Sequence, residues 1–240
     1  MRSAYVQWIR AIRALAQRIG LIDGLRRSSH PISAHLLSLF AIYDLDQMIT
    51  LDRPWWTYRA ADHVEAFLLG RRSARVFEYG AGASTIWLAK RSAEVHTVEH
   101  DAAFAESLVA HLHACPTATL HAVAPSSRTS TSGATSQRRG YDHASFDDYV
   151  DTIDRVGGTF DLIVIDGRSR QACLARAVDR LAPDGLIVFD NSNRDRYRST
   201  IDSSGLHERS LRGWCPALPV RSVTSLLTLQ IPQDAPHHDS

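Results

Sequence analysis

Short apolar runs alternate with amphipathic segments along the middle of the chain. The apolar runs cover 75–79, 94–99, 162–165 and 186–189. Uninterrupted runs of this length are typical of strands that are buried on both faces of a parallel sheet. The segments between them carry apolar residues at intervals of three and four, which predicts helices. This alternation predicts an α/β fold with a doubly wound, mainly parallel sheet.

Less regular segments complete the predicted elements. Three more strands, at 119–124, 205–211 and 223–231, would bring the sheet to seven strands. Helices are predicted over 1–27, 32–49, 59–69, 101–114, 141–156 and 194–204, and a turn at Pro183-Asp184-Gly185 leads into the strand at 186–189.

Two segments lack any apolar periodicity. Residues 125–140 are rich in serine and threonine, which predicts a mobile loop that is either a lid or a disordered insertion. Residues 232–240 are predicted to be a disordered tail. We therefore divide the chain into an N-terminal helical extension at 1–53, a main domain at 54–231 and the tail.

The first predicted helix, 1–27, is basic as well as amphipathic. Four arginines share its polar face, and no acidic residue occurs before Asp23. A helix of this kind can lie on an anionic membrane surface. It can equally dock its apolar face on the main domain or on a second subunit, which would make the protein a homodimer.

Composition narrows the classes of function. The 240 residues are 44% hydrophobic and 22% charged with a formal net charge of +1, so no global charge favours nucleic acid. Three separated cysteines, Cys115, Cys173 and Cys215, indicate neither a disulfide framework nor a zinc site. The sequence contains no apolar run long enough to span a membrane, and its N-terminus does not resemble a signal peptide. We therefore expect a cytoplasmic protein.

The strand at 75–79 runs into a turn of very small residues, Gly80-Ala81-Gly82-Ala83, and then into a helix that Ser84 and Thr85 can cap. Such a turn lets a ligand approach the backbone and the helix N-terminus. A dinucleotide fingerprint would need its third glycine at Thr85, which disfavours NAD. The sequence fits a second type of glycine turn instead, in which an acidic residue stands two positions before the first glycine, as Glu78 does before Gly80.

Acidic residues follow the other apolar runs as well. Glu99, followed by His100, lies about twenty residues beyond the glycine turn, where nucleotide folds place an acid on the ribose hydroxyls. Asp166 and Asp190 end two further strands, and Asn191 follows the second. Because the carboxyl ends of parallel strands meet at one edge, we expect these side chains to share a cleft.

Together these motifs resemble the class I S-adenosylmethionine-dependent methyltransferases, with Ser84 where the last glycine of the family's first motif usually stands. Phe160 to Gly167 and Leu181 to Ile187 match later motifs in the same order. The resemblance implies an antiparallel last strand and a catalytic domain at 54–231. It implies S-adenosylmethionine contacts at Glu78, Gly80, Ala81, Gly82, Ser84, Thr85, Glu99, His100 and Asp166. The acid that often meets adenine after the third strand is replaced by Ala124-Pro125.

The chain also resembles a bacterial branch of that family found beside saccharide-modifying enzymes, and the metal-dependent catechol and caffeoyl-CoA O-methyltransferases. The latter resemblance implies Mg²⁺ or another divalent cation held by Asp166, Asp190 and Asn191. Those enzymes have a lysine where this chain has Ser169. Without a metal, Asp166 is the candidate general base, and Arg168 is the second candidate catalytic residue.

Acceptor binding is expected from two groups of residues. Trp55 and Tyr58 could form an aromatic wall, or could belong to a packing corner with Trp56. Arg168, Arg170 and Arg194 could bind an acidic substrate group, or could simply be solvated.

We therefore expect O-methylation of a small-molecule or saccharide-like acceptor. The alternatives are an NAD-linked oxidoreductase and a non-catalytic cofactor-binding module. No base-methylation motif is present in the sequence, so nucleic acid is not expected as a partner.

Overall fold

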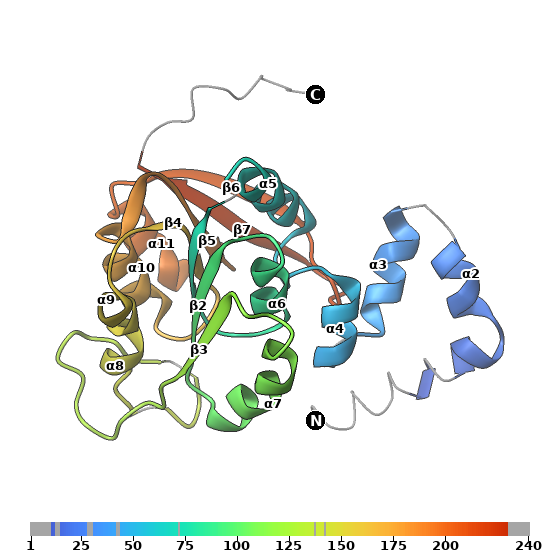
Figure 1. The fold of residues 1–240 in the computed structure, drawn as a ribbon, viewed down its shortest axis with the longest axis horizontal. Helices are drawn as coiled ribbons and strands as arrows, with labels where there is room; N and C mark the ends of the chain where they lie inside the picture. The colour runs from blue at the N-terminus through green and yellow to red at the C-terminus, as the bar shows by residue number, and fades with distance from the viewer. Residues whose placement is uncertain are drawn as a thin grey trace.

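The computed structural model describes residues 11–12, 15–27, 31–41, 44–71, 73–136, 138–141 and 143–229. Its centre is a seven-stranded sheet with the order β3-β2-β1-β4-β5-β7-β6 (Figure 1). The strands are β1 (Arg75–Tyr79), β2 (Glu94–Glu99), β3 (Ala118–Ala122), β4 (Phe160–Ile165), β5 (Leu181–Asp190), β6 (His207–Trp214) and β7 (Arg221–Thr228).

The first five strands of the chain are parallel, and β7 runs antiparallel to both β5 and β6. This confirms the predicted doubly wound, mainly parallel sheet with an antiparallel last strand. The register aligns Tyr79 with Val98 and Ile165, and Ile165 with Phe189. The parallel strands therefore end at one level, and the residues after them share one edge of the sheet.

Helices cover both faces of the sheet (Figure 1). They are α5 (Tyr58–Leu69), α6 (Ala83–Ala89) and α7 (Ala102–Leu112) on one side, and α8 (Asp147–Val150), α9 (Thr152–Val156), α10 (Arg170–Val178) and α11 (Asp195–Asp202) on the other. Side chains alternate along β1, so that Val76 joins the core beneath α5 and α6, whereas Phe77 and Tyr79 join the core beneath the second group. These two apolar cores fix the level of every strand end.

Three more helices precede the sheet: α2 (Leu21–Arg27), α3 (Pro31–Leu39) and α4 (Leu45–Leu51). Helices α2 and α3 pack on each other, whereas α4 packs on α6. Residues 1–10, 13 and 14 of the predicted basic helix at 1–27 lie outside the described residues. In its described part the chain turns at Gly20, with φ +71°, before α2 begins. None of the described helices has the length and apolarity that a membrane crossing requires.

Several predicted boundaries are wrong. The segment at 32–49 forms two helices, since Asp44 caps α4 by accepting a hydrogen bond from the Gln47 amide. Residues 141–156 form only the short α8 and α9, because the chain before Phe146 is extended enough for Ser145 to bridge Ser126. The predicted turn at 183–185 lies inside β5, which begins at Leu181 and has an irregular register beside β4.

The loop at 125–140 folds against α8. Asp147 accepts hydrogen bonds from the hydroxyls of Ser130 and Ser132, both at 2.6 Å, and Ala134 is fully buried. Ser169 donates to the Thr135 carbonyl at 2.7 Å, which joins the loop to the segment after β4. The part of the loop that the structure describes therefore has a defined path, while its predicted mobility stays a prediction.

A buried glutamate shapes the turn between β1 and α6. Glu78 is completely inaccessible to solvent, and its two oxygens accept hydrogen bonds from the Ser84 and Thr85 hydroxyls, each at 2.5 Å. The Thr85 hydroxyl also accepts from the Gly82 amide at 3.0 Å. Burial raises the pKa of Glu78 from 4.5 to about 7, although the hydroxyl hydrogen bonds oppose that shift. The turn is thus built around a carboxyl group that is easily protonated.

This pKa predicts a specific pH dependence of stability. The folded protein holds a proton on Glu78 that the unfolded chain releases above about pH 4.5, so stability falls as pH rises from about 4.5 to about 7. The full effect is roughly 3 kcal/mol. In Glu78→Gln this contribution disappears, because the amide does not titrate. Urea unfolding of both proteins across that pH range should show that the free energy of unfolding of the variant increases relative to that of the wild type as pH rises.

Glu106→Gln is the matched control, since Glu106 is exposed on α7. Its stability should follow the wild-type pH profile. Parallel profiles for Glu78→Gln and the wild type would contradict the assignment.

Candidate active site

A cavity of about 640 Å³ opens at the edge where the parallel strands end. The glycine turn after β1 forms one wall, the residues after β2 and β4 form the next, and α4 closes the side away from the sheet. The predicted site residues on its lining are Trp55, Gly80, Ala81, Gly82, Ser84, Glu99, His100, Asp166, Arg168, Arg170, Asn191 and Arg194. Glu99, Asp166 and Asn191 therefore share one cleft, whereas Asp190, which was expected beside them, does not line it.

Four predicted site residues do not line the cavity. Glu78 and Thr85 lie behind the glycine turn, where they hydrogen-bond to each other. Tyr58 points toward α3, and its hydroxyl lies 3.3 Å from Ser38 Oγ. Asp190 is almost completely buried beneath the lining. The direct contacts expected of Glu78, Thr85 and Tyr58 are corrected accordingly, since each hydroxyl or carboxyl group is already used within the protein.

Two adjacent tryptophans after α4 have different roles, one in a packing corner and one in the pocket wall. Trp56 is fully buried and meets Trp87 edge to face, with ring centroids 5.9 Å apart. Trp55 lines the cavity. The packing-corner interpretation therefore describes Trp56, and the pocket-wall interpretation describes Trp55.

Two glycines bring the ends of β1 and β4 into close contact. Gly80 has φ +99°, and a Cβ atom placed there would lie 2.6 Å from the Gly167 Cα atom. A Cβ on Gly167 would in turn lie 2.9 Å from the Tyr79 carbonyl oxygen and would clash with the Tyr149 hydroxyl. Neither position has room for a side chain. The backbone itself therefore forms the floor of the cavity.

Glu99 is held at one end and open at the other. Its Oε1 accepts hydrogen bonds from the amides of His100, at 2.9 Å, and Asp101, at 2.8 Å. Among the described residues no donor reaches Oε2, and Glu99 lines the cavity. A carboxylate oxygen with free lone pairs at such a wall can accept hydrogen bonds from ligand hydroxyls.

His100 links Glu99 to Arg168. Arg168 Nε donates to His100 Nε2 at 3.2 Å, so the ring proton must lie on Nδ1, which is 2.6 Å from Glu99 Oε1. Nε2 is therefore engaged by Arg168, whereas Nδ1 is buried and has no hydrogen-bond partner in the described part of the chain. The ring fixes the direction in which Arg168 leaves the wall.

Arg170 lies between the carboxylates of Asp166 and Asp190. Its guanidinium is 2.6 Å from Asp166 Oδ1 and 3.7 Å from Asp190 Oδ2, and it also donates to the Asp190 carbonyl. Thr224 donates to the other Asp190 oxygen at 2.8 Å. Arg170 is thus a structural counter-ion, and the expectation that it binds an acidic substrate group is corrected.

The same arrangement does not fit the hypothesis of a divalent cation. A metal held by Asp166 and Asp190 would occupy the position of the Arg170 guanidinium, which already neutralises both carboxylates. The third expected ligand, Asn191, donates its amide to Ser222 at 3.2 Å. Within the described ranges no cluster of three His, Cys, Asp or Glu side chains has metal-binding geometry.

Burial dominates the titration of this pair of acids. It raises the pKa of Asp190 to about 7, and the negative charge of Asp166 adds to the shift while Arg170 opposes it. Burial likewise raises the pKa of Asp166, against the attraction of Arg170. Burial thus disfavours the ionised form of both acids, and the charge of Arg170 favours it.

Sequence reasoning missed the contribution of α4 and α7. Leu45 and Met48 of α4, with Phe104 at the start of α7, give the cavity an apolar wall. Asp44 and Leu218 also line it. No motif identifies these residues, because their role comes from the packing of α4 on α6. Of these residues, Phe104 is the nearest in sequence to a predicted site residue, since it lies five residues after Glu99.

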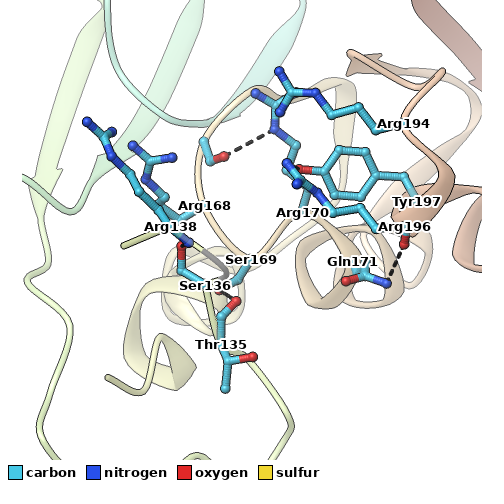
Figure 2. A pocket seen from close by; sticks show the side chains of 11 residues that line it. Thr135, Ser136, Arg138, Arg168, Ser169, Arg170, Gln171, Arg194, Arg196 and Tyr197 are labelled. Atoms are coloured by element: carbon cyan, nitrogen blue, oxygen red, sulfur yellow. Dashed lines mark hydrogen bonds between the residues drawn. The ribbon is translucent and has the colours of Figure 1, made fainter. Parts of the chain in front are cut away.

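A second cavity, of about 260 Å³, adjoins the first and shares Arg138, Gly167, Arg168, Arg170 and Arg194 with it. Figure 2 shows five arginines around it, with Arg138 and Arg168 on one side and Arg170, Arg194 and Arg196 on the other. The predicted grouping of Arg168, Arg170 and Arg194 is therefore present. Arg138 and Arg196 were missed, since a loop and a helix that are far apart in sequence supply them.

Comparison with known proteins identifies the domain. Residues 77–192 match a protein-family model described as a methyltransferase domain. No curated protein matches the chain. The matched segment begins inside β1 and ends after β5, so it contains the glycine turn, Glu99, Asp166 and Asp190.

Solved structures resemble the chain in fold. Cofactor-bound Rv0187 from MTB is 19% identical and superimposes with a TM-score of 0.51, over 80% of this chain and 90% of that one. An rRNA methylase from Streptococcus thermophilus is 12% identical with a TM-score of 0.47, over 70% and 95%. A methyltransferase-like protein from Silicibacter pomeroyi is 23% identical with a TM-score of 0.44, over 71% and 88%. At these identities the likeness concerns the fold alone.

The family match and the sheet topology agree with each other and disfavour the oxidoreductase alternative. Residues 77–192 are therefore similar to a methyltransferase domain, and the chain is an enzyme with the class I S-adenosylmethionine-dependent methyltransferase fold.

Proposed function

We propose that the protein transfers a methyl group from S-adenosylmethionine to an oxygen atom of a small-molecule acceptor, with saccharide-like compounds included. The observation that carries the proposal is a cavity whose lining combines an open Glu99 Oε2 with the small residues and exposed backbone of the glycine turn. An acid for a ribose and bare backbone for a polar chain are the two features that such a donor needs.

The lining suggests how the donor would lie. Its ribose hydroxyls would donate to Glu99, and the adenine ring would rest against Phe104, Leu45 and Met48, which supply apolar surface. The methionine portion would then extend along 80–84 toward Asp166. Each part of the donor is thus assigned to the lining residues whose chemistry suits it.

The bound donor supplies an electrophilic methyl carbon on a sulfonium, and the protein's residues supply position and proton transfer. The acceptor oxygen forms a bond to that carbon as the carbon–sulfur bond breaks, and S-adenosylhomocysteine leaves. The hydroxyl proton must go to a base at the same time. Asp166 is the candidate, since it lines the cavity and burial raises its pKa above that of an ordinary aspartate, which makes it a stronger base.

Donor binding can be tested without knowing the acceptor. Glu99→Gln keeps an oxygen for the amides of His100 and Asp101 but replaces Oε2 with an amide that cannot accept a hydrogen bond. Isothermal titration with S-adenosylhomocysteine should show affinity reduced roughly tenfold to a hundredfold. Glu106→Gln should bind like the wild type. Equal affinity in all three proteins, or preferential binding of NAD, would remove the proposal.

We expect the reaction to need no divalent cation. The Arg170 guanidinium already satisfies Asp166 and Asp190, so added Mg²⁺ gains no vacant carboxylate pair. Titration of the S-adenosylhomocysteine complex with Mg²⁺ should give no binding heat, and EDTA should leave turnover unchanged. Saturable Mg²⁺ binding that Asp190→Asn abolishes would show that the ion displaces Arg170.

The role of Asp166 predicts a pH profile. Turnover of an acceptor found by screening should rise with pH through the pKa of Asp166, since only the ionised form accepts a proton. Asp166→Asn should lower kcat by roughly a hundredfold or more and remove that rise. A variant that keeps the wild-type pH profile would exclude Asp166 as the base.

A further inference from the structure

The arginine-lined cavity beside the donor cleft identifies the chemical class of the acceptor. We propose that it binds a phosphate or similar tetrahedral dianion carried by a small-molecule acceptor, whose hydroxyl group then reaches the donor cleft. This inference rests on the proposed methyl transfer, and it adds what the second cavity recognises.

The charge of this cavity is not balanced from within. Of its five arginines, only Arg170 holds carboxylates. Among the described residues no carboxylate lies within ion-pair distance of Arg138, Arg168, Arg194 or Arg196. Several arginines elsewhere are paired with acids; Arg198, for example, holds both Asp202 and Glu208 at 2.7 Å. Four guanidinium groups thus face one small space with no described carboxylate in ion-pair contact, and only Arg194 of the four acts on a nearby acid, Asp166, through its charge.

The cavity is also built from fixed parts. Arg168 is oriented by its hydrogen bond to His100, and Arg196 is held by the Tyr197 hydroxyl at 3.0 Å, with its guanidinium carbon 4.7 Å from that ring's centre. The hydrogen bond from Ser169 to Thr135 fixes the loop that carries Arg138 (Figure 2). Such anchoring reduces the side-chain entropy lost when a ligand binds.

The geometry favours a tetrahedral dianion over a carboxylate. A carboxylate presents two oxygens in one plane, which suits a single guanidinium. Arginines approach this cavity from opposite sides, as Figure 2 shows, and a phosphate presents three oxygens in different directions. The first turns of α10 and α11 also line it, and helix N-termini attract negative charge.

Size and position favour a small molecule over a nucleic acid. The cavity holds about 260 Å³, which suits one phosphorylated group and not an extended strand. It shares Arg168 and Arg194 with the donor cleft. An anion anchored here would therefore place the rest of the acceptor at the mouth of that cleft, close to Asp166.

Inorganic pyrophosphate is a suitable probe, because it presents tetrahedral phosphoryl groups without any acceptor group. Isothermal titration into the wild-type protein saturated with S-adenosylhomocysteine should show one saturable site that weakens as salt is raised. The double variant Arg194→Gln with Arg196→Gln should lose affinity at least tenfold. Arg212→Gln is the matched control, since Arg212 is exposed on β6, and it should bind like the wild type.

Each outcome decides between the two proposals. Absence of pyrophosphate binding to the wild type, or equal binding in all three proteins, would overturn the anion site while leaving S-adenosylhomocysteine binding intact. Loss of S-adenosylhomocysteine binding in the wild type would instead overturn the proposed function. A short single-stranded RNA that binds more tightly than pyrophosphate, and fails to bind the same double variant, would overturn the small-molecule class.

Discussion

Four carboxyl groups lie at one edge of a parallel sheet, and the structure around them depends on how each is accommodated. The register makes this crowding unavoidable, because β1, β2, β4 and β5 end at the same level. Glu78 is accommodated by two hydroxyls, Glu99 by two backbone amides, and Asp166 with Asp190 by one guanidinium. Only Glu99 and Asp166 keep contact with the cavity. The edge thus separates acids that build the site from acids that can act in it.

The sequence predicted the sheet well because its signal is local. Continuous apolar runs mark strands that are buried on both faces, and the acid after each run marks its exit. The helix boundaries were predicted less well, since a boundary such as the one at Asp44 depends on a single capping hydrogen bond inside an apolar segment. The segment at 183–185 looked like a turn because of its proline and glycine, yet it pairs irregularly as the start of β5.

The site was predictable where one motif carries one role, and not where roles are shared. Glu99 and the glycine turn lie where spacing placed them, on the cavity wall. Arg170 was grouped with Arg168 and Arg194 because all three are arginines near strand ends. Its different role depends on distances to Asp166 and Asp190, which belong to separate strands. The same distances turn an apparent metal-binding pattern into an internal ion pair, a distinction that residue types alone do not make.

The position of α4 changes what counts as the smallest working unit. The family match begins at Phe77. Leu45 and Met48, which close one side of the main cavity, belong to α4, and α5 lies between α4 and the start of the match. A shortened protein that starts at Pro54 would keep both apolar cores but open that side to water. Chimeras that exchange residues before Pro54 between related chains would therefore alter the cavity without changing any motif residue. In evolutionary terms, ligand preference could drift through a helix that family boundaries leave out.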